Sequence, residues 1–147
     1  MTRIKMEMQI HHLPQKLQNK EEALIEIGLN TAKEIGLQAE SCNFIFVDDR
    51  HLSDMHEQYL QDPSKTDVIT FNLGEDKIEG EIYISAERAV EQAREYSVSL
   101  EEEIIRLFIH GLLHLKGYND KTESERAEMK TIENTLVEKY AAPFKKK

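Results

Sequence analysis

The segment from residue 104 to residue 115 is almost entirely apolar, and its polar exceptions fall at a helical spacing. Its apolar members are Ile104, Ile105, Leu107, Phe108, Ile109, Leu112, Leu113 and Leu115. A helix that is apolar nearly all round is expected to be buried. The exceptions Arg106, His110 and His114 lie four residues apart and share one helix face. An unpaired polar group costs about 1–3 kcal/mol when it is desolvated, so this stripe needs partners.

His110 and His114 are spaced so that both can reach a single metal ion. Imidazoles at positions i and i+4 lie roughly 6 Å apart on one helix face, and zinc–nitrogen bonds are about 2.0–2.1 Å long. Gly117 is expected to end the helix, because glycine is favoured just past a helix C-terminus. The chain then reverses towards Asp120, whose carboxylate is a suitable zinc ligand. The pattern H-x3-H-x2-G-x2-D therefore predicts a metal site formed by His110, His114 and Asp120.

The alternative is that the two histidines are ordinary core or surface side chains, which is commoner for such a pair taken alone. The apolar helix, the glycine turn and the carboxylate together favour metal binding. A catalytic ion is favoured over a structural one, because structural zinc prefers cysteine and Cys42 is far away in the sequence. Imidazole and carboxylate suit one zinc ion per chain, with nickel, iron and manganese as alternatives.

The composition indicates an ordinary globular protein. The chain has 147 residues, with 19 Lys plus Arg and 28 Asp plus Glu, and a formal net charge of −9. Its single cysteine excludes an internal disulfide and fits a reducing cytosol. No stretch approaches the ~20 apolar residues of a membrane span, and the N-terminus lacks the apolar run of a signal peptide. We expect one domain over residues 1–147, located in the cytoplasm and without a membrane partner.

Alternation and β-branched runs predict strands at residues 4–10, 44–47, 66–71 and 80–84. The last two are expected to form an antiparallel hairpin. Helices are predicted from Asn19 to Gly36, over 48–61, from Ser85 to about Tyr96, from a Ser99–Glu102 capping box, and from a Thr122–Glu125 capping box. Strands lead and helices close the chain, so the fold class is expected to be α+β, with one mixed sheet and helices around a buried metal-binding helix.

The stretch His110–Tyr118 resembles the signature of the YbeY endoribonuclease family, the rRNA maturation factors. Other segments fit the same family in order. Thr66–Phe71 resembles its T-D-V-L-S-F strand, and Gly80–Ile84 is similar to its G-D-I strand start. The segment Glu125–Glu133 is similar to its closing helix, E-x-x-M-x-x-x-E. The resemblance is specific from Met55 to Leu136 and weaker before that.

The resemblance implies a four-stranded mixed sheet and a zinc-dependent endoribonuclease that cuts single-stranded RNA in rRNA maturation and ribosome quality control. It also implies RNA, as an rRNA precursor or the ribosome, and a ribosomal protein or GTPase as partners. The family's helical histidines match His110 and His114. Its third ligand is usually a histidine after G-Y-D, but this chain has Asn119 and Asp120 there. Aspartate also ligates metals, so the change alters the charge of the site and leaves metal binding possible.

A second departure concerns phosphate binding. The family usually carries an arginine after an L-N-x-x-Y segment, and the matching position here is Leu60. Binding of the RNA phosphate then has to come from elsewhere, with Lys65 and Arg106 as candidates. A protein with a net charge of −9 needs a local basic patch or a partner to bind RNA.

The candidate catalytic residues are Lys65, Asp67 and Arg106. Asp67 has an alternative role as a residue that anchors the start of a strand. For Arg106 we slightly favour an alternative role in a buried ion pair with Glu102 or Glu103 on its own helix. The nucleophile is then either a metal-activated water or the 2′-hydroxyl of the RNA substrate.

Two rival functions remain open. A zinc metallopeptidase-like hydrolase has similar ligand spacing, but zinc proteases carry a glutamate directly after the first histidine. This chain has Gly111 at that position, which leaves Glu81 as another candidate base. A non-catalytic ribosome-associated protein that keeps the metal for stability is the second rival, and the loss of the arginine at Leu60 supports it.

Overall fold

The computed structural model describes residues 6–60 and 68–144. The elements in chain order are β1 (Glu7–His11), η1 (Gln15–Lys20), α1 (Glu21–Ile35), β2 (Ala39–Val47), α2 (Asp49–Leu60), β3 (Val68–Asn72), β4 (Ile78–Ser85), α3 (Ala86–Glu95), α4 (Leu100–Lys116), α5 (Glu123–Tyr140) and η2 (Ala142–Phe144). The elements labelled η are short 3-10 helices. The predicted α+β class is confirmed.

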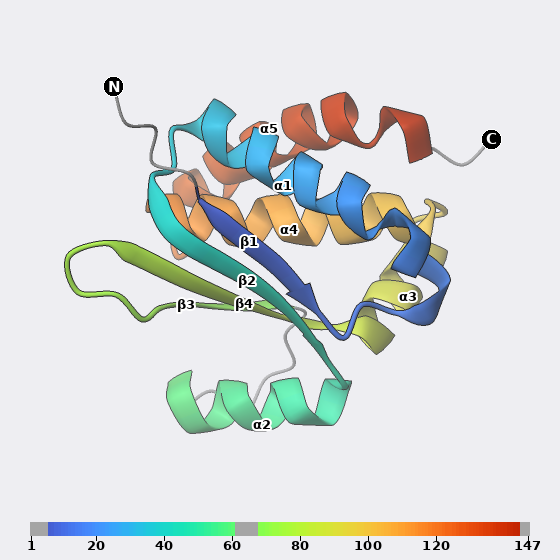
Figure 1. The fold of residues 1–147 in the computed structure, drawn as a ribbon, viewed down its shortest axis with the longest axis horizontal. Helices are drawn as coiled ribbons and strands as arrows, with labels where there is room; N and C mark the ends of the chain where they lie inside the picture. Colours follow the sequence, from blue (N-terminus) through green and yellow to red (C-terminus); the bar gives the residue numbers. More distant parts are fainter. Residues whose placement is uncertain (1–5, 61–67, 145–147) are drawn as a thin grey trace.

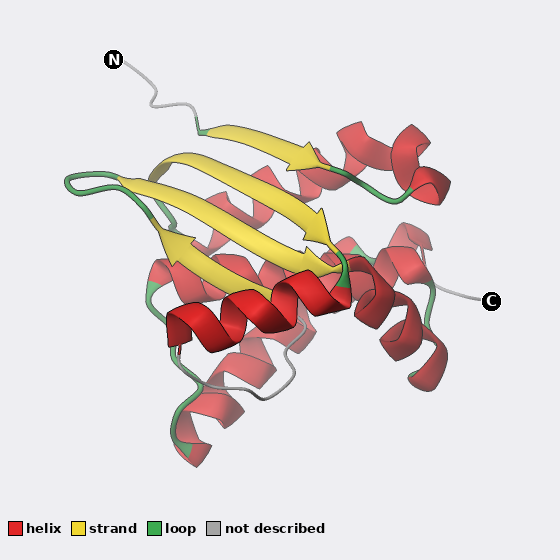
Figure 2. Cartoon of the chain, turned by 90° about the horizontal axis from the view of Figure 1, so that it is seen from below, coloured by secondary structure: helices red, strands yellow, loops and turns green. Residues whose placement is uncertain are grey.

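The four strands form one mixed sheet in the order β1-β2-β4-β3. Strands β1, β2 and β4 are parallel, and β3 pairs antiparallel to β4, which confirms the predicted hairpin. Helices α1, α4 and α5 lie on one face of the sheet, and α2 lies on the other (Figures 1 and 2). Parallel strands are usually covered on both faces, and this arrangement covers the sheet in that way.

Helix α4 lies in the core between the sheet and helices α1 and α5 (Figure 1). Its buried residues are Glu102, Glu103, Ile104, Ile105, Leu107, Phe108, Ile109, Gly111, Leu112 and Leu113. The Phe108 ring stacks on Phe44 of β2, with ring centroids 3.8 Å apart and planes inclined by 10°. The prediction of a buried histidine-bearing helix is confirmed, and two glutamates near its start, Glu102 and Glu103, are buried with it.

Two glycines allow α4 to approach the sheet closely. A Cβ atom placed on Gly111 of α4 would lie 2.7 Å from Cγ2 of Ile82 on β4. A Cβ atom placed on Gly80 of β4 would lie 2.5 Å from Cδ1 of Leu115 on α4. Each glycine therefore accommodates a branched side chain of the opposite element, and any larger residue would push helix and sheet apart.

The element boundaries differ from the predictions in two places. Strand β2 begins at Ala39, well before the predicted start at residue 44, because its polar residues alternate with buried ones. The predicted helix start at Asn19 is wrong, since Asn19 lies in η1 and α1 begins at Glu21 without a side-chain cap. Residues 4, 5, 66 and 67 of the predicted strands lie outside the described residues.

The other predicted helix ends agree with the structure. Ser85 caps α3 and Thr122 forms a complete capping box with Glu125 at the start of α5. The Ser99 hydroxyl accepts a hydrogen bond from the Glu102 amide at the start of α4, as one half of the predicted box requires.

No helix within residues 6–60 and 68–144 is both long and apolar enough to cross a membrane.

Substitution of Gly111 by alanine is expected to destabilise the protein. Overpacking against Ile82 costs about 1–3 kcal/mol, and the better helix propensity of alanine returns about 0.5–1 kcal/mol. The free energy of unfolding, measured by urea denaturation, should fall by about 1–2 kcal/mol. Gly28→Ala in α1 is the matched control, because its Cβ would meet the flexible Met8 side chain at 2.6 Å. Equal losses in both variants would contradict a specific requirement for glycine at 111.

Candidate metal centre

The two histidines of α4 face each other at the edge of the buried helix. Their side chains are 26% and 25% exposed, for His110 and His114 respectively. Their Nε2 atoms are 3.1 Å apart. Two nitrogen ligands of a tetrahedral zinc ion are separated by about 3.3 Å, as follows from the length of the zinc–nitrogen bond. The pair is therefore close to the spacing that a shared ion requires.

The partners of the two Nδ1 atoms determine which nitrogens face inward. Nδ1 of His110 lies 2.7 Å from a carboxylate oxygen of Glu133, and Nδ1 of His114 lies 3.0 Å from the main-chain carbonyl oxygen of Tyr118. Both oxygens accept hydrogen bonds, so both Nδ1 atoms donate and neutral rings carry their lone pairs on Nε2. Two lone pairs that face each other at 3.1 Å repel unless a cation lies between them. This arrangement is typical of histidine ligands to a metal.

Asp120 completes the group, because the chain reverses at Gly117. Gly117 adopts a φ of 120°, a conformation that favours glycine, and the amide of Tyr118 bonds back to the Leu113 carbonyl oxygen at 3.0 Å. Oδ2 of Asp120 then lies 3.6 Å from Nε2 of His114 and 4.0 Å from Nε2 of His110. The ligand atoms of the three residues lie within 4.8 Å of one another, so the group can hold a metal ion.

Arg126 anchors the loop that carries Asp120. Its Nη1 atom donates to the main-chain carbonyl oxygens of Asp120 at 3.2 Å and of Lys121 at 3.1 Å. The Thr122 capping box holds the next residues at the start of α5. Sequence analysis identified the capping box but not Arg126, because no local pattern indicates a side chain that bonds back to main-chain carbonyls.

Glu133 contacts the candidate metal centre, and sequence analysis did not single it out. It is buried on α5, accepts from Nδ1 of His110, and accepts from Nη1 of Arg106 at 3.0 Å. Burial alone would raise the pKa of Glu133, but hydrogen bonds from His110 and Arg106 and the charge of Lys130 hold that pKa below its usual value. The resemblance placed Glu133 in the closing helix of the family. Its i, i+4 spacing from Met129 puts both residues on one helix face, and this spacing could have indicated that Glu133 faces inward.

Arg106 forms an ion pair, but with a different carboxylate from those predicted. Its Nη1 atom donates to Glu133 and also to Oδ1 of Asn134 at 2.8 Å. The prediction had placed the partner on the same helix, at Glu102 or Glu103. Arg106 instead lies on the side of α4 that packs against α5, so its charge reaches across the helix contact.

Burial and the neighbouring His110 hold the pKa of His114 below its usual value, against a smaller opposite effect of Asp120. A neutral imidazole is the form that binds a metal. The candidate residues Lys65 and Asp67 lie outside the described residues, as does the side chain of Leu60. Glu81, the other candidate base, accepts a hydrogen bond from the Tyr83 hydroxyl at 2.8 Å.

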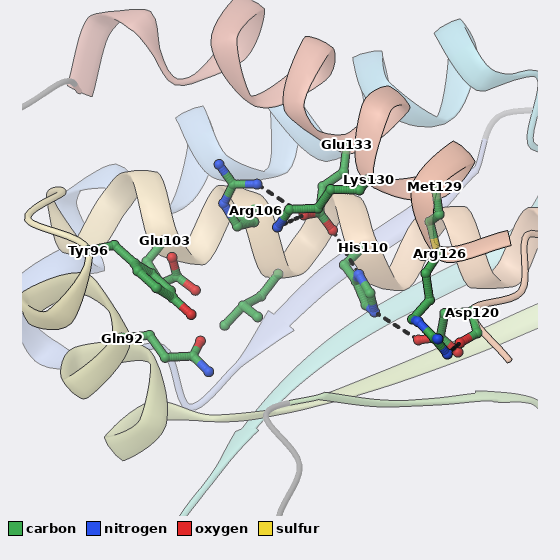
Figure 3. A pocket seen from close by; sticks show the side chains of 11 residues that line it. Gln92, Tyr96, Glu103, Arg106, His110, Asp120, Arg126, Met129, Lys130 and Glu133 are labelled. Carbon is green, nitrogen blue, oxygen red and sulfur yellow. Dashed lines mark hydrogen bonds and ion pairs between the residues drawn. The ribbon is translucent and has the colours of Figure 1, made fainter. Parts of the chain in front are cut away.

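A cavity of about 250 Å³ opens beside His110 and Asp120, between α3, α4 and α5. Figure 3 shows its lining, with Arg126 next to Asp120 and with Arg106 and Lys130 near Glu133. Three charged residues of α5, Arg126, Lys130 and Glu133, line it beside the apolar Met129.

Comparison with known proteins agrees with this geometry. The family model described as "Endoribonuclease YbeY" matches residues 4–141. The chain belongs to the YbeY family. An endoribonuclease YbeY from Amoebophilus asiaticus is 44% identical over 108 residues, which cover 69% of this chain and 74% of that protein. The YbeY of Chlorobium phaeobacteroides is 30% identical over 139 residues, covering 94% of this chain and 97% of that protein.

The fold is also that of a solved structure. The solution structure of TM1509 from Thermotoga maritima superposes with a TM-score of 0.62 at 28% sequence identity, covering 95% of this chain and 91% of that chain. The family model and the curated relatives thus confirm the resemblance to the YbeY family that the motif around His110 indicated.

Glu133→Gln is expected to weaken metal binding without unfolding the protein, because the amide is similar in shape but lacks the charge that orients His110. Loss of such an outer partner typically costs about 10–100-fold in metal affinity. Titration with zinc in competition with a chelator measures this. Glu128→Gln, an exposed position on the same helix, is the control and should leave the affinity unchanged. Similar affinities for both variants would exclude the proposed role of Glu133.

Asp120→Ala should weaken zinc binding far more than Asn119→Ala, because only Asp120 directs a carboxylate at the two Nε2 atoms. Both residues are exposed, so neither change is expected to lower the unfolding temperature appreciably. The same chelator competition compares them. Equal zinc affinities would remove Asp120 from the ligand group.

Proposed function

We propose that this chain is a zinc-dependent endoribonuclease that cuts single-stranded RNA during rRNA maturation and ribosome quality control. The observation that carries the proposal is the pair of Nε2 atoms 3.1 Å apart, with both Nδ1 atoms held by acceptors and Asp120 within reach. Membership of the YbeY family supports RNA as the substrate.

We propose one ion per chain, held by His110, His114 and Asp120. Two imidazoles and one carboxylate match the three protein ligands of catalytic zinc sites, which keep a position open for substrate. When bound, the ion would polarise a phosphoryl oxygen and stabilise the charge that develops during cleavage. The same donors accept other divalent transition metals, so nickel, iron and manganese belong in the assay beside zinc.

The residues of the chain prepare this site before substrate arrives. Glu133 and the Tyr118 carbonyl fix the ring orientation of His110 and His114. Arg106 neutralises Glu133, so we assign Arg106 the role of a positioning residue. Binding of the RNA phosphate is then left to other cations. Lys65 and Asp67 are proposed as further residues of the reaction, in proton transfer or phosphate binding.

The location and partners follow from the same proposal. An rRNA precursor or the ribosome, in the cytoplasm, is the proposed substrate, and a ribosomal protein or GTPase is the proposed partner that delivers this acidic chain to RNA. The net charge of −9 opposes binding to a polyanion at long range, so contacts must be local or mediated by a partner.

The peptidase alternative is disfavoured by the packing at Gly111. Zinc proteases use a glutamate directly after the first histidine as the general base. At Gly111 even a Cβ atom would lie 2.7 Å from Ile82, so a glutamate there would force the helix away from the sheet. A peptide-hydrolysis assay under the same conditions should therefore give no turnover.

His114→Ala is expected to remove both bound zinc and cleavage of a single-stranded RNA oligonucleotide, with duplex RNA as a resistant substrate. The exposed His51 on α2 supplies the matched control, since His51→Ala should keep both properties. Metal content by atomic emission and cleavage on a denaturing gel are the two measurements. Robust cleavage by a metal-free His114→Ala variant would overturn the mechanism. Zinc binding by the wild type without any RNA cleavage would favour a non-catalytic ribosome-associated protein.

A further inference from the structure

The cavity beside the candidate metal centre has the chemistry of a nucleotide site. We infer that it binds one unpaired nucleotide adjacent to the scissile phosphate, with the base stacked on Tyr96 and the phosphate beside Arg126. This inference rests on the proposed cleavage of RNA. It assigns a position to the substrate that the metal ligands alone do not define.

The cavity is an elongated groove that starts at the metal centre. His110 and Asp120 line one end, and Gln92 and Tyr96 of the α3 region line the other (Figure 3). Along α4 it extends from His110 back to Glu103, a separation of about 10 Å at 1.5 Å per residue. A nucleotide next to a phosphate at the metal centre would therefore lie in the groove.

The surface of the groove suits a flat aromatic base. Leu107 and Met129 line it and are only 3% and 2% exposed, so they present a small apolar area beneath the opening. Tyr96, which is 60% exposed, stands at the end of α3. Among the described residues, the exposed large apolar side chains are Leu73, Val90 and Tyr96, and of these Tyr96 alone lines the groove. Aromatic side chains of this kind stack with unpaired bases.

The wall formed by α5 suits a phosphate. The two hydrogen bonds of Arg126 from Nη1 go to neutral main-chain carbonyl oxygens, so its charge is not cancelled by these partners. A guanidinium has five N–H donors, which leaves others for an anion. Lys130 lies one turn further along α5, with a side chain 63% exposed, and pairs with Glu133, which Arg106 also contacts. In an acidic chain, these cations beside Asp120 supply the local positive charge that RNA binding requires.

This arrangement selects single strands. In a duplex, each base is paired and stacked between its neighbours, so it cannot enter a groove of about 250 Å³ and stack on a protein ring. A peptide side chain would use the apolar surface but would leave the cationic wall without an anion. The combination of exposed ring and cations therefore favours a nucleotide.

The test compares Tyr96→Ala with Tyr96→Phe in the zinc-loaded protein, using a fluorescein-labelled hexauridylate as the probe. Loss of one base–aromatic stack should weaken binding by about 5- to 150-fold, measured by fluorescence anisotropy. Tyr96→Phe keeps the ring and should bind like the wild type. Leu73→Ala, an equally exposed apolar residue outside the groove, is the matched control. Zinc content is measured for every variant and should not change.

A second set of probes carries a single abasic ribose at successive positions. In the wild type, one position should reproduce the loss seen for Tyr96→Ala, and in Tyr96→Ala the same abasic probe should cause no further loss. Additive losses, equal loss in Tyr96→Phe, or no loss in Tyr96→Ala would overturn the nucleotide site.

The two proposals fail in different ways. Base-dependent binding without cleavage by the wild type would refute the nuclease proposal and support the nucleotide site. Cleavage by the wild type with unaltered binding by Tyr96→Ala would refute the nucleotide site alone. Absence of any RNA binding by the zinc-loaded wild type would overturn both.

Discussion

The close approach of α4 to the sheet is the constraint on which the rest of this structure depends. Gly111 admits Ile82, Gly80 admits Leu115, and the Phe44 and Phe108 rings stack at 3.8 Å along the same contact. Because this face of α4 is occupied by the sheet, the polar stripe can only face sideways, towards α5 and the turn after the helix. The same packing that buries the helix thereby directs its histidines to the edge of the core.

The candidate metal centre is consequently formed by elements that are separate in the sequence. Helix α4 supplies the two imidazoles, the turn at Gly117 returns Asp120, and α5 supplies the Glu133 carboxylate that holds His110. Arg106 then balances the charge of Glu133, so the buried carboxylate is paired on both sides. Both imidazoles have a partner that fixes their direction, and Arg126 anchors the loop that carries Asp120. Such outer partners are usual around metal ligands.

The proposed substrate groove lies on the α5 side of this centre, and three elements contribute different chemistry to it. The stripe of α4 lines one side, α5 contributes cations, and the end of α3 contributes an exposed aromatic ring. A protein with a net charge of −9 thus places Arg126 and Lys130 where, in the proposed complex, an RNA phosphate would approach the ion. Such a local arrangement allows binding without a broad basic surface.

Periodicity, capping residues and one motif were sufficient to predict the helices, the hairpin and the grouping of His110, His114 and Asp120, since these depend on neighbours within a few turns. The Asn19 start failed because a 3-10 helix occupied the cap position. The places of Glu133 and Tyr96 beside the candidate site became visible only in the folded protein. Their positions relative to His110 depend on how α5 and α3 pack against α4, and no local pattern in the chain encodes the angle between helices that are distant in sequence.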